Sequence, residues 1–152
     1  IGILDKPYNF LTQPFAAKMV ILLGLLWRWT GYNMVFFLSG LQNIEYSVYE
    51  AAKIDGASAI QTFFKITVPL LKPTILLTAI MSTNGTLQLF DESINLTDGG
   101  PANASISMSH YIYNLCFKYV PNFGYAAAMS FFILLLVAVL AFIQMRVGDK
   151  RD

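Results

Sequence analysis

Charged residues are scarce in this chain. Asp, Glu, Lys and Arg make up 12% of its 152 residues, about half the share found in a typical soluble domain. Hydrophobic residues reach 56%, and the mean hydropathy is +0.56. The formal net charge is only +1 and the sequence contains no basic patch, so nucleic acid is not an expected partner. This composition is typical of a membrane protein.

Cysteine and histidine are represented by one residue each. A single cysteine, Cys116, excludes an internal disulfide framework, and we expect it to fill space in the packing. The single histidine, His110, argues against a histidine-rich metal or catalytic site, and we expect it to be a polar residue at a membrane interface. The sequence therefore predicts neither metal ligands nor catalytic residues.

The start of the chain has neither an initiator methionine nor a signal-peptide pattern. Its first residue is Ile1. The opening residues do not show the three parts of a signal peptide, which are a basic region, a short apolar run and a cleavage site with small residues. We therefore expect the chain to be a fragment whose true N-terminus is missing.

Three segments are apolar enough to be expected to cross a bilayer, which takes about 20 mainly apolar residues. The first carries Arg28 near its middle, and the second is short and contains Asn84 and Gln88. The third has no charged residue and no polar face, which argues against a set of buried helices in a soluble protein. We predict an all-α, polytopic membrane protein. Its three spans lie at about 19–41, 74–90 and 124–145.

Basic residues predict how these spans are oriented, because cytoplasmic loops carry an excess of Lys and Arg. The 42–73 loop and the C-terminal tail together contain six basic residues, and the other side contains three. We therefore expect the 42–73 loop and the tail in the cytoplasm, and the 91–123 loop outside. The cytoplasmic set is Lys53, Lys65, Lys72, Arg146, Lys150 and Arg151, and the outer set is Lys6, Lys18 and Lys118.

The 42–73 loop has the pattern of two short amphipathic helices. Gly56 is expected to end the first helix, because glycine tolerates the left-handed conformation that helix ends often need. Ser58 and Gln61 have the spacing of a capping box that begins the second. Pro69 is expected to stop the second helix, and Pro73 to begin the next span. The apolar faces are Ile44, Val48, Ala51 and Ala52 in the first helix and Ile60, Phe63, Phe64 and Val68 in the second.

These apolar faces allow two interpretations of the hairpin. It lies flat on the membrane surface, or it docks into a groove of a cytoplasmic partner. The spacing of the residues does not choose between them.

The hairpin resembles the EAA loop of permeases from binding-protein-dependent ABC importers. The family pattern has Leu where this chain has Val68, and it often has Pro where this chain has Glu45. The flanking segments "WRWTGYNMVFFLSGLQNI", "TNGTLQLFDESINLTDGGP" and "FGYAAAMSFFILLL" resemble the sugar-importing branch, which includes the maltose and multiple-sugar transporters. Nearly the whole chain takes part in the resemblance. Because members of this family usually have six or more spans, the resemblance implies that the chain is the C-terminal half of a permease. The motif positions are Glu50, Ala51, Ala52, Gly56, Ile66, Val68 and Pro69.

The resemblance implies a subunit that catalyses no reaction itself and that lies in the plasma membrane of a bacterium. Its partners are two ATP-binding subunits, a second permease subunit, an extracytoplasmic sugar-binding protein and membrane lipid. ATP and Mg²⁺ belong to the ATP-binding subunits, and this chain lacks the glycine-rich phosphate loop that ATP would need. The loop then forms coupling helices, and Glu50 pairs with a basic group of the partner. The implied coupling residues are Glu50, Ala51, Ala52, Asp55, Gly56, Ile66 and Pro69.

Polar residues within the spans are candidates for the substrate pathway. Amide side chains both donate and accept hydrogen bonds, which suits sugar hydroxyls. The alternative is that these side chains bond to neighbouring helices, as amide and small residues commonly do in membranes. The candidates are Tyr32 and Asn33 on the first span and Met81, Asn84, Gly85 and Gln88 on the second.

Three further charged residues are less easily assigned. Arg28 is expected to face the helix bundle or to reach toward the outer surface. A less favoured alternative is that Arg28 binds an anionic substrate, such as a sugar phosphate. Asp91 and Glu92 are adjacent and on a helix are not expected to face the same site. The acidic loop "DESINLTDGGP" either forms a solvated turn or contacts the binding protein.

Two competing functions remain at this point. The same machinery transports another solute, such as glycerol phosphate, because the EAA loop is shared among branches. Alternatively, the chain is a membrane scaffold whose hairpin lies on the bilayer. A membrane enzyme is not favoured, because the sequence offers no paired carboxylates or histidines at membrane depth.

Overall fold

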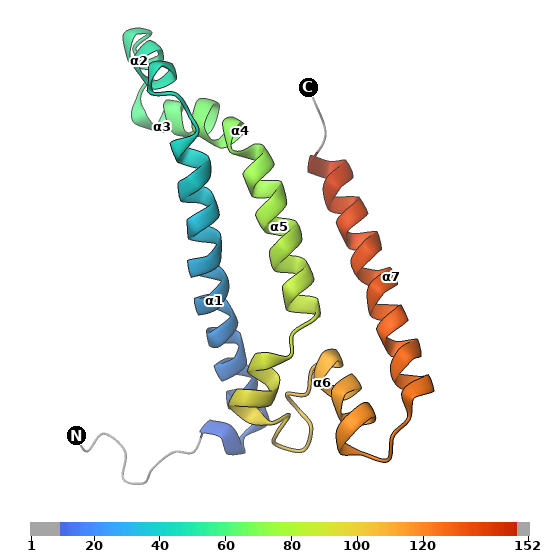
Figure 1. The fold of residues 1–152 in the computed structure, drawn as a ribbon. Helices are drawn as coiled ribbons and strands as arrows, with labels where there is room; N and C mark the ends of the chain where they lie inside the picture. The colour runs from blue at the N-terminus through green and yellow to red at the C-terminus, as the bar shows by residue number, and fades with distance from the viewer. Residues whose placement is uncertain (1–9, 149–152) are drawn as a thin grey trace, which may run out of the picture. The chain divides into compact units, whose positions relative to one another are not determined.

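A computed structural model describes residues 10–148, and these residues form helices and turns with no strand among them (Figure 1). The all-α prediction is confirmed for this part of the chain. Three long helices dominate, and three π-helical turns interrupt or extend shorter ones. The elements are η1 (Phe10–Thr12), α1 (Pro14–Gln42), α2 (Tyr46–Ile54), α3 (Ala59–Thr62), η2 (Phe63–Thr67), α4 (Val68–Leu70), α5 (Lys72–Leu87), η3 (Ser93–Thr97), α6 (Met108–Tyr113), η4 (Asn114–Lys118) and α7 (Phe123–Gly148).

Two of these helices, α1 and α7, are long and apolar enough to cross a membrane. Helix α5 has 16 residues and ends at Leu87, short of the predicted end at Phe90. It qualifies only together with the preceding helical segment Ala59–Leu70, from which it is bent by 65°. The described residues thus contain two candidate spans, or three if the bent pair is counted as one span.

The chain divides into two compact units, and each is described by itself. The hairpin unit contains Trp29–Thr83 and the residues from Val139 onward. The loop unit contains the residues up to Arg28 and Asn84–Ala138. The boundaries between them fall within α1, α5 and α7.

In the hairpin unit, small residues allow helices to approach closely. A Cβ atom on Gly40 of α1 would lie 2.9 Å from side-chain atoms of both Leu71 and Thr74, so a larger residue at this position would displace these side chains at the start of α5. At the end of α7, a Cβ atom on Gly148 would lie 2.6 Å from Leu76. Such close packing over small residues is a common source of attraction between helices in membranes.

In the loop unit, α1 buries one face and leaves its others open. Ala17, Ile21 and Leu25 are the buried residues of this helix, and their four-residue spacing places them on one side. Gly24 lies beside η3, where a Cβ atom would be 3.3 Å from Leu96. The interior of the unit is partly polar, because Ser93 and His110 are completely buried.

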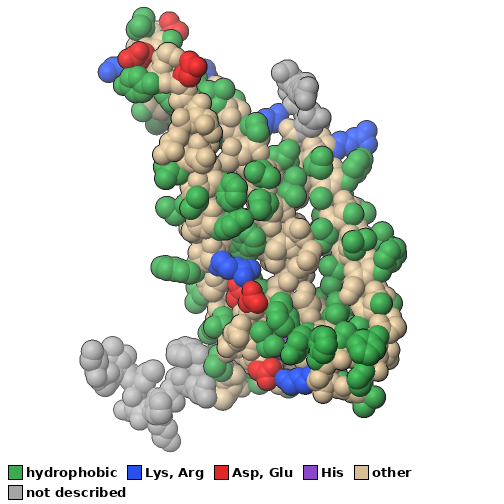
Figure 2. Space-filling model, viewed as in Figure 1, with side chains coloured by type: hydrophobic (Ala, Val, Ile, Leu, Met, Phe, Trp, Pro, Cys, Tyr) green, Lys and Arg blue, Asp and Glu red, His purple; other side chains and the backbone are tan. Residues whose placement is uncertain are grey.

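Large hydrophobic side chains remain exposed along α1 and α7. Trp27 is 85% exposed, and Phe131 and Phe142 are each 62% exposed. Figure 2 shows hydrophobic side chains over much of the face in view and few charged ones. Helix α7 is apolar on all sides, which suits a lipid environment better than water. The chain is therefore membrane-embedded.

Candidate functional site

The elbow of the hairpin forms where the sequence predicts it. Helix α2 ends at Ile54, Asp55 is its C-cap, and Gly56 has a φ of +73°. The amides of Ala57 and Gly56 donate to the carbonyl oxygens of Ala52 and Lys53, which is the Schellman arrangement. Among the described residues, nothing lies within 4 Å of a Cβ atom built on Gly56. The need for glycine therefore comes from the left-handed backbone and not from crowding.

The second arm of the hairpin begins with the predicted capping box. The Ser58 amide donates to Gln61 Oε1 at 2.9 Å, and the Gln61 amide donates to Ser58 Oγ at 3.3 Å. Two amides at the start of the helix are thereby satisfied by side chains. Ser58 and Gln61 are three residues apart, so the spacing in the sequence is enough to predict the capping box.

The second helix ends at Leu70, one residue beyond the predicted stop at Pro69. The helical segment passes from α3 through the wider turn η2 and continues through Pro69 to Leu70. Pro69 follows the wider turn η2, and the segment ends one residue after it. The chain bends after Leu70, and Pro73 lies in the first turn of α5 as predicted.

The two arms of the hairpin are held together by a contact that sequence reasoning missed. The hydroxyl groups of Tyr49 and Thr67 lie 3.2 Å apart and share a hydrogen bond. Thr67 is 6% exposed and Ala52 is also 6% exposed, so both lie inside the hairpin. The residues around them form a pocket of about 490 Å³. Its lining is Tyr49, Lys53, Ala57, Ala59, Thr62, Phe63 and Thr67.

The outer surface of the hairpin carries most of the predicted coupling residues. Glu50, Ala51, Asp55, Gly56 and Pro69 are exposed, Ile66 is half-buried, and only Ala52 is buried. Apolar neighbours are exposed with them. Ile54 is 85%, Ile60 is 72% and Phe64 is 65% exposed. Within the described part of the chain, this apolar surface is not covered.

In the hairpin unit, one of the predicted pathway residues, Asn33, bonds to a neighbouring helix. Asn33 of α1 donates to Ser82 Oγ at 3.0 Å, and Ser82 donates back to Asn33 Oδ1 at 3.2 Å. Tyr32 is 43% exposed, and its ring packs at 5.5 Å against Trp29. Met81 is half-buried. The Asn33 amide thus joins two helices, whereas Tyr32 remains partly exposed beside Trp29 and Phe36.

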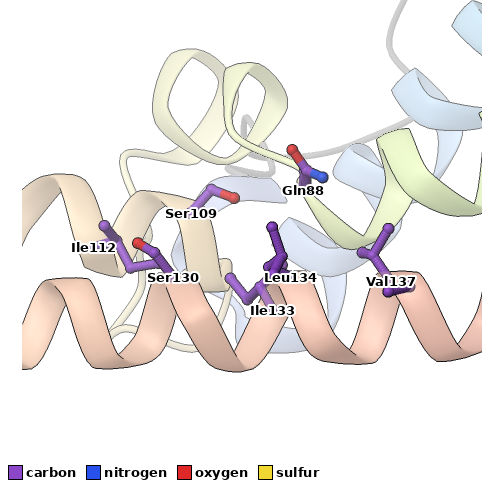
Figure 3. A pocket seen from close by; sticks show the side chains of 8 residues that line it. Gln88, Ser109, Ile112, Ser130, Ile133, Leu134 and Val137 are labelled. Atoms are coloured by element: carbon purple, nitrogen blue, oxygen red, sulfur yellow. The ribbon is translucent and has the colours of Figure 1, made fainter.

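In the loop unit, the predicted amide pair lies at the end of α5. Gln88 Nε2 donates to Asn84 Oδ1 at 2.6 Å, and both residues are exposed, whereas Gly85 is half-buried. Gln88 also lines a pocket of about 470 Å³. Figure 3 shows Gln88 facing Ser109 of α6 and the side chains of α7. Sequence reasoning missed the two serines of this pocket. The lining is Gln88, Ser109, Ile112, Ser130, Ile133, Leu134, Val137 and Ala138.

Arg28 pairs with the two acidic residues that were expected to face different sites. Its Nη1 atom lies 3.0 Å from Glu92 Oε1 and 3.8 Å from Asp91 Oδ2. That expectation is therefore wrong. One guanidinium nitrogen at the end of the long Arg28 side chain thus comes within ion-pair distance of both adjacent carboxylates.

His110 is completely buried within the loop unit, and its Nδ1 atom lies 2.9 Å from Ser93 Oγ. Ser93 donates its only hydroxyl proton to the Ser105 carbonyl and accepts the Ser107 amide. Nδ1 must therefore carry a proton and donate to Ser93.

The other ring nitrogen of His110 faces a carboxylate. His110 Nε2 lies 3.7 Å from Asp98 Oδ1 and has no hydrogen-bond partner among the described residues. Burial lowers the pKa of His110 from 6.5; Asp98 raises it, and Lys118, which pairs with Asp98 at 3.0 Å, lowers it. No sequence pattern indicated this network, because its hydrogen bonds join residues 12 to 20 positions apart.

Comparison with known proteins places the chain among transport proteins. The family model described as "Binding-protein-dependent transport system inner membrane component" matches residues 7–151. The chain is 54% identical to "Lactose transport system permease protein LacF" of Rhizobium radiobacter, over 99% of this chain and 51% of that protein. It is 36% identical to "Multiple sugar-binding transport system permease protein MsmF" of Streptococcus mutans, over 99% and 51%.

A solved structure shares the fold. The crystal structure of a bacterial ABC transporter involved in the import of the acidic polysaccharide alginate superposes with a TM-score of 0.81 at 24% identity, over 97% of this chain and 51% of that chain. The chain spans about half the length of the curated relatives that it matches.

Proposed function

The chain belongs to the family of inner membrane components of binding-protein-dependent transport systems, and from this premise we propose that it forms part of the permease subunit of an ATP-driven importer of a sugar or oligosaccharide. The relatives that support this proposal are named as permeases for lactose and for multiple sugars. Lactose is the first sugar to test, because the relative named for it is 54% identical.

The hairpin is the proposed coupling element of this importer. The observation that carries the proposal is its exposed surface, in which Glu50, Ala51 and Asp55 lie beside the uncovered Ile54 and Ile60. Small and acidic residues on a rigid elbow suit close docking into a cleft of another protein. We assign that cleft to an ATP-binding subunit, which holds ATP and Mg²⁺. The proposed coupling set remains Glu50, Ala51, Ala52, Asp55, Gly56, Ile66 and Pro69.

The rest of the assembly follows from the same proposal. The 42–73 loop and the C-terminal tail face the cytoplasm, and the 91–123 loop faces outward toward a sugar-binding protein. Spans at about 19–41, 74–90 and 124–145 pack against a second permease subunit and lipid in a bacterial plasma membrane. The proposed pathway residues are Tyr32, Asn33, Met81, Asn84, Gly85 and Gln88, of which Asn84 and Gln88 have exposed amides.

The first test is a crosslinking experiment on the hairpin. In the full-length protein with Cys116→Ser, a cysteine at the exposed Ala51 is co-expressed with the ATP-binding subunit. We expect a crosslink whose yield changes with ATP. Ala52→Cys is the matched control, because Ala52 is 6% exposed and lies inside the hairpin, so it should crosslink far less.

Lactose uptake in the same cells completes the test. We expect uptake to fall strongly when Gly56 is replaced by Leu, because the elbow needs a positive φ. A hairpin that lies on the membrane surface predicts the opposite: no crosslink from Ala51 or Ile54, and uptake indifferent to Gly56. That result would remove the coupling role.

A further inference from the structure

The loop unit contains a pocket whose lining combines polar and apolar side chains. It has a volume of about 470 Å³ and is lined by residues from the end of α5, from α6 and from the 130–138 part of α7. Small-molecule sites usually enclose about 300–1,000 Å³ and are mainly apolar with a few polar groups. This pocket has both properties, and none of its eight lining residues is charged.

Three side chains supply the polar groups of the pocket. Gln88 Nε2 donates to Asn84 Oδ1 at 2.6 Å, which orients the amide and leaves its second N–H and its oxygen for a ligand. Ser130 donates its proton to the Ala126 carbonyl at 2.9 Å, so its oxygen remains an acceptor. The Ser109 hydroxyl forms no hydrogen bond with another described residue. The pocket therefore offers donors and acceptors that the described part of the chain does not use.

The apolar part of the pocket lies opposite these groups. Figure 3 shows Gln88 and Ser109 facing Ile133 and Leu134 of α7. Ile133 is 9% exposed and gives the pocket a packed floor, whereas Leu134 is 59% exposed. A sugar ring is amphipathic in the same way, because its hydroxyl groups lie around its edge and its C–H bonds cover its faces.

The position of the pocket along the chain agrees with entry from outside. Gln88 lies near the end of the predicted span 74–90, Ser109 lies in the 91–123 loop, and Ser130 lies within the first two turns of the predicted span 124–145. In the proposed orientation these are the outer ends of both spans and the outward-facing loop. From Ser130 to Ala138 helix α7 rises by about 12 Å, so the pocket extends from the outer part of this span toward its middle.

We propose that this pocket is an entry subsite for a neutral sugar, in which Gln88, Ser109 and Ser130 bind hydroxyl groups and Ile133 and Leu134 contact the face of the ring. This inference rests on the proposed function and names a site and a substrate class for it. The uncharged lining favours a neutral sugar, because an anionic one would bring its charge into the pocket without a cation to pair with it.

Other occupants fit the lining less well. An acyl chain of a lipid would cover the Ser109 hydroxyl and the free groups of the Gln88 amide without bonding to them, and such burial is unfavourable. A helix of another subunit is the second alternative. It would keep water and sugar out of the pocket, which the experiments below detect.

The first experiment measures lactose uptake. The full-length permease is reconstituted in proteoliposomes with its partner subunits and a binding protein saturated with radiolabelled lactose. Ser109→Ala and Gln88→Leu should each lower the uptake rate about fivefold, the worth of roughly one neutral hydrogen bond. Ser39→Ala, at an exposed position of α1, is the matched control and should transport as the wild type does. Wild-type rates in both pocket variants would overturn the inference and leave the proposed function intact.

The second experiment does not depend on transport. In a Cys116→Ser background, the purified complex with Ser109→Cys is treated in detergent with a water-soluble thiol reagent. We expect the variant to react and lactose to slow the reaction. Ser47→Cys, on the exposed surface of the hairpin, should react at the same rate with and without lactose. A Ser109→Cys variant that does not react, or that lactose does not protect, would overturn the inference and assign the pocket to a helix or a lipid.

A charged analogue tests the substrate class. Lactose in which a carboxylate replaces one primary hydroxyl should protect the Ser109→Cys variant at least about tenfold less well, because its charge has no partner in the lining. Equal protection by the two sugars would overturn the assignment to neutral sugars. If the wild type imports neither lactose nor maltose, the proposed function itself fails, and the subsite fails with it.

Discussion

The helical hairpin and the 91–123 loop are both polar insertions between apolar helices, yet they hold their shapes by different means. The hairpin uses caps and a glycine elbow and leaves apolar side chains such as Ile54 uncovered. The 91–123 loop closes around Ser93 and His110, which are completely buried. The hairpin surface is therefore suited to binding another molecule, whereas the loop is stabilised by its own buried contacts.

The largest effect should come from the interior of the loop. Ser93→Ala leaves the Ser105 carbonyl, the Ser107 amide and the protonated Nδ1 of His110 without their partner. Buried groups left unsatisfied cost about 1–3 kcal/mol each. Because relaxation recovers part of this loss, we expect a destabilisation of about 2–4 kcal/mol. The measurement is the unfolding free energy of the purified full-length protein in detergent.

The control for this change is Ser39→Ala on an exposed position of α1, which should change stability by less than about 0.5 kcal/mol. If both alanine variants were equally stable, the 91–123 loop would not depend on its buried network, and the contrast with the hairpin would disappear.

The hairpin elbow should give the next largest effect. Gly56→Ala places a side chain on a residue with a φ of +73°, and a left-handed backbone costs a non-glycine residue about 1–2 kcal/mol. Gly31→Ala is a closely matched control, since a Cβ atom at either glycine meets nothing within 4 Å among the described residues. Gly31 lies within α1, where alanine is the better helix former.

The same unfolding measurement separates the two glycines. We expect Gly56→Ala to destabilise the protein and Gly31→Ala to be neutral or slightly stabilising. Similar behaviour of the two variants would mean that the elbow conformation contributes nothing to stability, and the rigid hairpin would have to be abandoned.

The sequence predicts the hairpin better than it predicts the loop, for a physical reason. Gly56 and the Ser58–Gln61 box act on residues within a few positions along the chain, so local spacing reveals them. The Ser93–His110 bond joins residues 17 positions apart, and the Asn33–Ser82 bond joins residues 49 positions apart. These pairs depend on how helices and turns meet, which no local pattern encodes.

The predictions that the structure corrects have the same origin. Asp91 and Glu92 were assigned to different sites from helix periodicity, which ignores the length of the Arg28 side chain. Pro69 was expected to stop its helix, but the wide turn η2 before it carries the chain through to Leu70. In both cases the local rule describes an isolated helix, and the neighbouring structure decides the outcome.

The buried histidine should make the stability of the loop depend on pH. Burial lowers the folded-state pKa of His110 below 6.5. As the pH falls below 6.5, the unfolded chain therefore binds a proton before the folded protein does, and stability decreases. Above this range both states are neutral at this residue, and its pH-dependent contribution vanishes.

Unfolding free energies of the wild type and His110→Gln, measured between pH 7.5 and pH 5, test this sign. The glutamine variant does not titrate here, so its curve should be flatter by at most the slope of one proton. Parallel curves for the two proteins would exclude His110 as a pH-sensitive part of the loop.

The smallest of these effects should come from the capping box of the hairpin. Ser58→Ala removes the oxygen that accepts the Gln61 amide, and such a change costs about 1 kcal/mol when the amide turns to water instead. The bond is exposed, so water offsets part of the loss, unlike at Ser93.

Ser47→Ala, whose side chain bonds to Glu45 on an exposed surface, is the control and should stay within about 0.5 kcal/mol. A Ser58→Ala loss as large as that of Ser93→Ala would mean that the hairpin, too, is stabilised by its polar contacts, and its uncovered apolar face would no longer distinguish it from the loop.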